Sequence, residues 1–352
     1  MYVAPRPRAE DDPLFAVRLA AATALAYAVA LWLRPAMPMI APALTAGIIA
    51  AMRGRFDPIK AFGGPITMAV MMWMMALLVN LLRPYPAALI LVMGVIYTLS
   101  YTLILRTGNP LGMLVLVASA LMSIMGLNSV PGMDFLRDVF IEGSAVALCL
   151  IPLLYALLPP ATREPAVEVY PVGTGSHYFL RGTIRGVVLL LLTYWLYTVV
   201  DQSNMMLAVA AIFVMVFPTR ERLWEEARQR IHATVLGGAL ALTILAAATL
   251  SAHLLNLLLL VFLGALLCGH RMMIGRQPPM VYQYALSSMV AIVGAALSAK
   301  APLETTLLRI VLTMGGAVSA ALLTNLLEAL LVDTQALPPA ADSATAQAGP
   351  VT

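Results

Sequence analysis

The fragment "AAMRGRFDP", residues 50–58, closes an apolar stretch with two arginines one residue apart. The fragment "FPTRERLWE", residues 217–225, closes a later apolar stretch in the same way. The arginines are Arg53 and Arg55 in the first fragment and Arg220 and Arg222 in the second, at an offset of 167 positions. A chain that repeats the same boundary in this way has the pattern of a duplicated unit.

Further matches extend from these fragments in both directions. At the same offset of 167, Arg18 corresponds to Arg185 and Tyr27 to Tyr194. Toward the end of each half the offset drifts to 172, where Gly143 corresponds to Gly315. Chance explains matches of alanine and leucine between apolar runs, but less readily an ordered series of Arg, Tyr, Pro and Gly. We therefore expect an internal repeat of six helices, and because six is even, both copies enter the membrane from the same side.

The composition indicates an integral membrane protein. Of the 352 residues, 61% are hydrophobic and only 11% are charged, and the mean hydropathy is +0.91. A soluble protein of this size carries about 25% charged residues. The arginines stand singly at the ends of apolar runs rather than on one face, so the net charge of +4 does not indicate nucleic-acid binding.

The long continuous apolar runs predict an all-α membrane protein with about 12 transmembrane helices in two parallel six-helix repeats. The expected segments are 14–33, 37–52, 61–82, 87–105, 111–127 and 139–158, then 183–200, 205–217, 231–250, 253–269, 280–297 and 305–332. The expected domains are a cytoplasmic N-terminal segment 1–13, a first repeat 14–158, a linker 159–182, a second repeat 183–332 and a disordered cytoplasmic tail 333–352.

Basic residues in the short loops predict the orientation. With the N-terminus inside the cell, most arginines of the loops fall on the inner side, and few basic residues fall outside. The positive-inside rule therefore predicts that both termini lie in the cytoplasm. The first apolar segment has no small-residue cleavage site after it, so we expect it to remain as an anchor rather than a signal peptide.

No pattern of residues indicates an enzyme. The sequence shows no P-loop, HExxH or nucleophile motif, and its two cysteines, Cys149 and Cys268, lie inside apolar runs as core residues do. We expect no catalytic residues, no metal site and no cofactor. A duplicated bundle with almost no soluble mass is typical of a transporter, and short or proline-interrupted segments at matching places point to its binding site.

The short second and eighth segments, 37–52 and 205–217, meet that description. An aromatic and polar site near them is a hypothesis that competes with simple core packing. Its candidate substrate-binding residues are Tyr27, Thr45, Tyr194, Trp195 and Asn204.

Arginines and carboxylates supply the remaining candidates. Arg18 and Arg185 lie one turn inside their helices, where they either snorkel to lipid phosphates or capture an anion. The anion-gathering candidates are Arg18, Arg53, Arg55, Arg185, Arg220 and Arg222. Proton coupling needs an ionisable group within the bilayer, for which the candidates are Glu142 and Glu328.

The chain resembles the fusaric-acid-resistance and aromatic-acid-exporter family. The resemblance is carried by "RLAAATALAYAVALWL", "PMIAPALTAGIIA" and "RGRFDPIKAFGG" in the first half, and by "RERLWEEARQRIHATVLGGALAL" in the second. It implies an inner-membrane efflux protein for aromatic carboxylic acids, driven by the proton gradient and working with a periplasmic adaptor protein. Larger members carry a soluble domain after each membrane half, and here only the linker and the tail stand in those places.

The leading hypothesis is therefore secondary efflux of an aromatic or other organic acid anion. A passive anion channel and a non-transporting membrane scaffold are the alternatives. The expected partners are the small organic acid, the bilayer and the adaptor, with a homo-oligomer also open.

Overall fold

The computed structural model describes residues 10, 12–33, 37–162, 178–198, 212, 215, 220–250, 253–298 and 302–332. Every element in these ranges is a helix. The first half contains α1 (Phe15–Leu33), α2 (Ile40–Ala51), the π-helical turn η1 (Ile59–Gly63), α3 (Gly64–Leu82), α4 (Pro86–Thr107), α5 (Leu111–Asn128) and α6 (Val130–Leu157). The second contains α7 (Tyr178–Thr198), α9 (Arg220–Thr249), α10 (Leu254–Ile274), α11 (Pro279–Ser298) and α12 (Pro302–Leu331).

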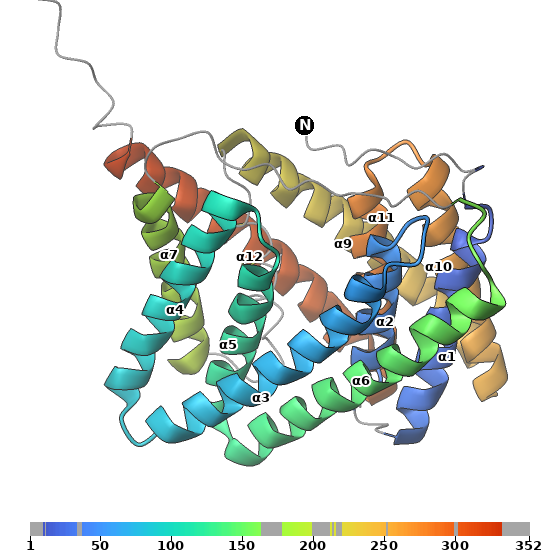
Figure 1. Ribbon diagram of the computed structural model, residues 1–352, viewed down its shortest axis with the longest axis horizontal. Coiled ribbons are helices and arrows are strands. Elements are labelled where there is room, and N and C mark those ends of the chain that lie inside the picture. The colour runs from blue at the N-terminus through green and yellow to red at the C-terminus, as the bar shows by residue number, and fades with distance from the viewer. Residues whose placement is uncertain are drawn as a thin grey trace, which may run out of the picture.

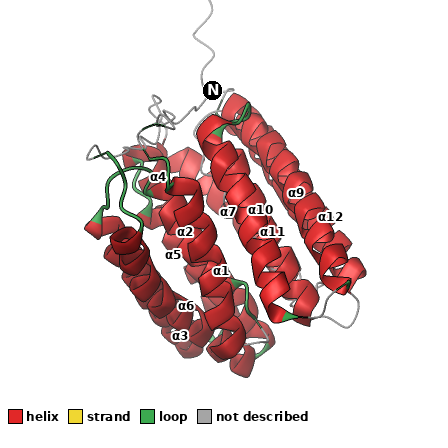
Figure 2. Ribbon diagram, turned by 90° about the vertical axis from the view of Figure 1, so that its right-hand side faces the viewer, coloured by secondary structure: helices red, strands yellow, loops and turns green. Residues whose placement is uncertain are grey.

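Nine of the described helices are long and apolar enough to cross a membrane, so the expected all-helical membrane class is confirmed. The helices form one tilted bundle, with α3 and α6 at one edge and α9 and α12 at the opposite edge (Figure 2). The short second segment is also present, because α2 has only 12 residues and spans about 18 Å at 1.5 Å per residue. Most of the expected eighth segment, 205–217, lies outside the described residues.

The same helix pairs pack in both halves. In the first half α3 packs on α5 and α6, and α4 packs on α5; in the second half α9 packs on α11 and α12, and α10 packs on α11. The two halves also exchange helices, since α1 packs along α10 while α7 packs along α4 (Figure 1). The first helix of each half thus lies against the fourth helix of the other half.

Two helices begin well before the expected boundaries. Helix α6 begins at Val130 rather than at residue 139, because Ser129 caps it by accepting a hydrogen bond from the backbone N–H of Gly132. Helix α9 begins at Arg220 rather than at residue 231. Apolar runs mark the part of a helix that lies in hydrocarbon. Hydropathy therefore does not predict a polar extension of the same helix.

The two arginine fragments that resemble each other in sequence differ in backbone conformation. After Arg53 the chain turns at Gly54, whose φ of 97° lies in the region that favours glycine. Glu221 stands at the matching place in the second fragment and is helical, so α9 continues through it. A glycine between the two arginines therefore ends the helix in one half, and its absence lets the helix extend in the other.

The ends of the helices that carry arginine gather on one side of the bundle, which we call the basic face. The start of α1 contacts the end of α6 and the end of α10, and the start of α7 contacts the ends of α4 and α12. These ends lie along the upper side of Figure 1. Arginines at helix ends on the basic face are Arg18, Arg53, Arg106, Arg185 and Arg271.

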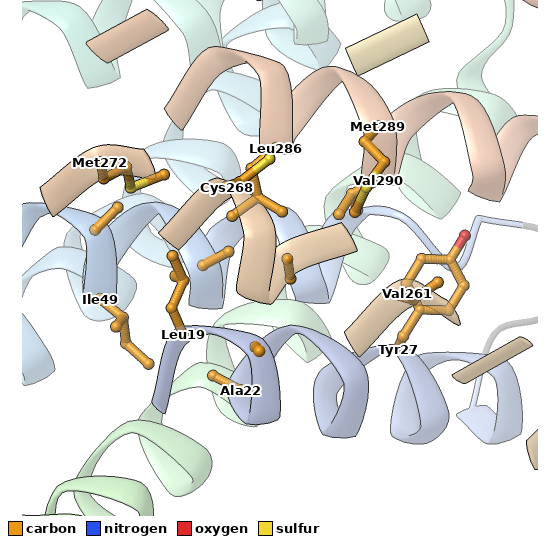
Figure 3. Packing of buried hydrophobic residues seen from close by; sticks show 14 of the residues in the cluster. Leu19, Ala22, Tyr27, Ile49, Val261, Cys268, Met272, Leu286, Met289 and Val290 are labelled. Atoms are coloured by element: carbon orange, nitrogen blue, oxygen red, sulfur yellow. The ribbon is translucent and has the colours of Figure 1, made fainter. Parts of the chain in front are cut away.

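Apolar packing and close glycine contacts join the two halves. Leu19 and Tyr27 of α1 pack in one cluster with Val261 and Cys268 of α10 (Figure 3). At the other crossing, a Cβ on Gly186 of α7 would lie 2.6 Å from Thr98 Oγ1 and 2.9 Å from Thr98 N on α4. Only glycine permits so close an approach, as is common where membrane helices cross.

Candidate functional site

Arg18 is fully buried at the start of α1 and is enclosed by partners from its own half. Its guanidinium forms an ion pair with Asp12, donates from Nη1 to the carbonyl of Leu158 at 3.1 Å, and lies 4.1 Å from the ring centroid of Tyr155. The Tyr155 hydroxyl in turn donates to the carbonyl of Met52. Burial raises the pKa of the Asp12 carboxyl above its ordinary value, and the Arg18 guanidinium offsets part of that rise.

Arg185 occupies the matching place in α7 and is also fully buried. Its Nη2 contacts Glu328 Oε1 of α12 at 3.0 Å, and the Glu328 side chain is only 4% exposed. Tyr101 of α4 and Arg181, one turn before Arg185, are the other groups whose charges or dipoles act on Arg185. A buried charge in an apolar bundle is rare and is usually functional or paired, and here the pair joins the first and last helices of the second half.

Three further polar side chains lie on helices that carry or contact this pair. Tyr101 and Thr324 are fully buried, and neither hydroxyl has a hydrogen-bond partner among the described residues. The side-chain amide of Asn325 is also without a partner in that part of the chain. Thr324 and Asn325 precede Glu328 on α12 by four and three residues, so they share its helix face. We call these five residues, Tyr101, Arg185, Thr324, Asn325 and Glu328, the Arg185 cluster.

A third buried ion pair lies near the start of α9. Arg230 Nη2 is 3.8 Å from Glu226 Oε1, and the guanidinium stacks on the ring of Tyr284 in α11 at 3.6 Å. Both charged side chains are largely buried. This pair lies within one helix and fixes α9 against α11, so its geometry is that of a packing contact.

The predicted aromatic site is not gathered in one environment. Tyr27 is buried in the α1–α10 contact, whereas Tyr194 of α7 is 49% exposed. Thr45 is buried, but its hydroxyl donates to the Ala41 carbonyl at 2.8 Å within its own helix. Trp195 belongs to α7 with its side chain outside the description, and Asn204 lies outside the described residues.

The predicted arginines and carboxylates divide into two groups. Arg18 and Arg185 neither snorkel nor lie open, because both are buried and ion-paired. Arg53 is also buried and donates from Nε to the Ala50 carbonyl at 2.9 Å, while Arg55 is exposed. Arg220 and Arg222 lie in the first turn of α9, and their side chains fall outside the description.

The two proton-coupling candidates also differ. Glu142 is half-buried near the middle of α6. Glu328 belongs to the Arg185 cluster. The structure therefore brings together Arg185 and Glu328, two residues that the sequence placed in different roles.

A family model described as fusaric acid resistance protein-like matches the chain from residue 177 to residue 323. The matched part of the chain is therefore similar to this family. The resemblance expected from the sequence is thereby confirmed. The matched residues of this family begin just before α7 and end within α12, so they include Arg185. No curated protein and no solved structure matches the chain.

This is a membrane transport and resistance family, and the apolar helices agree with it. Together they indicate a multi-pass membrane protein of the transporter type.

Sequence reasoning missed Tyr101, Thr324 and Asn325. Hydroxyls and amides in apolar helices give no periodic signal, but Thr324 and Asn325, two polar residues within about one turn of Glu328, form a pattern that is visible in the sequence. It also missed the spacing of Gly182 and Gly186, a small-xxx-small pair that predicts a close helix contact.

Proposed function

We propose that this fusaric acid resistance protein-like chain is a secondary efflux transporter for aromatic or other organic acid anions. The observation that carries the proposal is the pair of buried arginines, Arg18 and Arg185, at the same place in the first helix of each half. Arginine is costly to bury in an apolar bundle, so two of them at one face indicate that the bundle handles negative charge.

The proposal includes a duplicated architecture in the bacterial inner membrane with both termini in the cytoplasm. The matching helix pairs and the reciprocal α1–α10 and α4–α7 contacts support a duplication. The basic face would then lie toward the cytoplasm. Arg55, together with Arg220 and Arg222 at the start of α9, would attract anions to this face by raising their local concentration.

The inside-negative membrane potential favours outward movement of an anion by about 2.3 kcal/mol per charge at 100 mV. The proton gradient is the second energy source that the family resemblance implies. The periplasmic adaptor remains part of the proposal, because the described connections opposite the basic face are short.

A growth assay tests the proposal. Cells that lack the chain are compared with complemented cells on a panel of aromatic acids, with neutral amides of the same rings as the control. Complemented cells should tolerate the acids better and the amides equally. Equal growth on every acid would contradict the proposal, and anion currents without any dependence on a proton gradient in purified vesicles would favour a passive channel instead.

A further inference from the structure

We propose that the Arg185 cluster is the binding site for the carboxylate of a monocarboxylic acid, and that Glu328 occupies the site as a built-in competitor while no acid is bound. This inference deepens the proposed function and takes its ligand class from it. It assigns binding roles to Tyr101, Thr324 and Asn325, and it makes the binding of the anion depend on a proton.

The threonine hydroxyls give the first argument. Among the described residues, four buried threonines donate to the carbonyl four residues earlier in their own helices: Thr23, Thr45, Thr193 and Thr234. Thr324 is equally buried but makes no such bond. Every helical threonine can reach that carbonyl. A threonine hydroxyl that does not donate to it is therefore available for another partner.

The amide of Asn325 and the hydroxyl of Tyr101 give the second argument. A buried polar group without a hydrogen bond costs about 1 to 3 kcal/mol, and native structures contain few of them. Here three such groups lie on α12, which carries Glu328, and on α4, which packs along α7. Their place on the helices that carry or contact the ion pair points to a polar ligand rather than to three independent defects.

The charges give the third argument. A buried guanidinium needs an anion, and removing that anion is strongly unfavourable. The carboxylate of a ligand offers Arg185 the same group that Glu328 offers, with hydroxyl and amide donors beside it. Two carboxylates at one arginine repel each other, and repulsion of this kind makes one of them take up a proton. Binding of the anion should therefore be accompanied by protonation of a Glu328 carboxyl oxygen.

The other charged groups near the cluster have partners or charges that leave Glu328 as the group that takes up the proton when the anion binds. From α7, Arg181 acts on Arg185 with a charge of the same sign, which favours a second anion. From α9, which packs on α12 through Leu223 and Ala227, Glu226 is paired with Arg230. From α11, Tyr284 lies under that same Arg230.

The surroundings select the body of the ligand. Val188 and Leu189 of α7 and Ala320 of α12 belong to one buried apolar cluster, against which Leu323 packs. Val188 and Leu189 lie three and four positions after Arg185, and Leu323 and Ala320 lie five and eight positions before Glu328. An apolar ring would pack against these side chains, whereas a second carboxylate would be placed among apolar groups, where a charge is costly to bury. Aromatic monocarboxylates should therefore bind better than dicarboxylates of the same size.

The linkage is measured by titration calorimetry of the full chain in detergent with benzoate, which stays ionised throughout the range used. The same titration in two buffers with different ionisation heats gives the number of protons taken up per benzoate. Wild type should take up about one proton, and its Kd should fall about tenfold per pH unit from about pH 8 to about pH 6. Zero uptake with a Kd that is independent of pH would overturn the inference.

Variants locate the effect. Glu328→Gln removes the competitor, so we expect tighter benzoate binding, no proton uptake and a Kd that no longer changes with pH. The matched control Glu226→Gln changes the other buried glutamate and should leave both readouts as in wild type. If Glu328→Gln keeps the pH dependence of wild type, the proton goes elsewhere and the inference fails. Benzoate should also raise the melting temperature of Glu328→Gln more than that of wild type, which shows that the variant is folded.

The role of the Thr324 hydroxyl in benzoate binding is tested in the same way. Thr324→Val should weaken benzoate binding several-fold while preserving shape, whereas Thr193→Val, which removes a hydroxyl already bonded within its helix, should not. Benzamide, which is neutral, should show no proton linkage with any variant. Proton-linked binding without transport in vesicles would count against the proposed function alone, and transport without linkage would count against this inference alone.

Discussion

A double-variant cycle on Arg185 and Glu328 measures how strongly the buried pair holds α7 to α12. The variants are Arg185→Gln, Glu328→Gln and both together. The pair is separated by 3.0 Å, with side chains 0% and 4% exposed, so each single change leaves one buried charge without its partner. Such losses cost about 3 to 5 kcal/mol. The double variant leaves no charge, and we expect it to be more stable than either single variant, with a coupling energy of about 2 kcal/mol or more.

The two single variants should also respond differently to pH. In Arg185→Gln the isolated Glu328 can take up a proton, so the free energy of unfolding should recover as the pH is lowered, by up to about 1.4 kcal/mol per unit. In Glu328→Gln the isolated arginine keeps its charge at every accessible pH, so no recovery is expected.

Unfolding by denaturant in mixed micelles, followed by intrinsic fluorescence, gives the four free energies. The control is Arg137→Gln, which breaks ion pairs with Asp134 and Asp138, both at 2.8 Å; the arginine is 25% exposed and the two carboxylates are 39% and 44% exposed. This control should cost no more than about 1 kcal/mol. The reasoning would be refuted if each single change at Arg185 or Glu328 lowered the free energy of unfolding no more than the control does, and if the two losses were additive in the double variant.

Three further variants test the packing. Gly186→Ala places a methyl group 2.6 Å from Thr98 Oγ1 and should lower the free energy of unfolding by about 1 to 3 kcal/mol. The control is Gly47→Ala, where nothing lies within 4 Å of the added methyl group and no loss is expected. Equal effects of the two variants in a denaturant titration would contradict the close α4–α7 contact. Tyr155→Phe removes the hydrogen bond to the Met52 carbonyl and should cost about 1 kcal/mol, measured as a lower melting temperature, while an unchanged value would show that the bond does not hold α6 to α2. Ser129→Ala removes the cap of α6 and should lower the free energy of unfolding by about 1 kcal/mol. Ser129→Thr is the control, because it retains a capping hydroxyl. The rate of hydrogen exchange at the first turn of α6 should rise only in the alanine variant.

Much of the fold could be predicted because long apolar runs are an unambiguous signal. The run 14–33 corresponds to α1 and the run 111–127 to α5 within one residue at each end. The starts of α6 and α9 could not be predicted in the same way, since their first turns are polar or amphipathic and follow capping and backbone geometry instead. Gly54 lies in a turn whereas Glu221, at the matching position, is helical. One residue therefore decides where such a helix ends.

The candidate site was predicted less completely. Arg185 and Glu328 were recognised separately as charged residues in apolar helices, but 143 positions separate them in the chain, and only tertiary packing brings α7 and α12 together. Tyr101 comes from a third helix. The burial of Arg18 was equally hidden, because its enclosure depends on Tyr155 and Leu158 at the end of α6. Local patterns reveal which residues are unusual, and packing decides which of them meet.

The central claim is that this chain moves organic acid anions outward across the membrane, and flux from vesicles tests it most directly. Purified chain is reconstituted into vesicles loaded with labelled benzoate, and a negative interior potential and a pH gradient are imposed separately and together. The account predicts benzoate release well above that from empty vesicles, faster with the potential than without it and reduced in Arg185→Gln. Release equal to that from empty vesicles under all these conditions, with the chain shown to be folded, would contradict it.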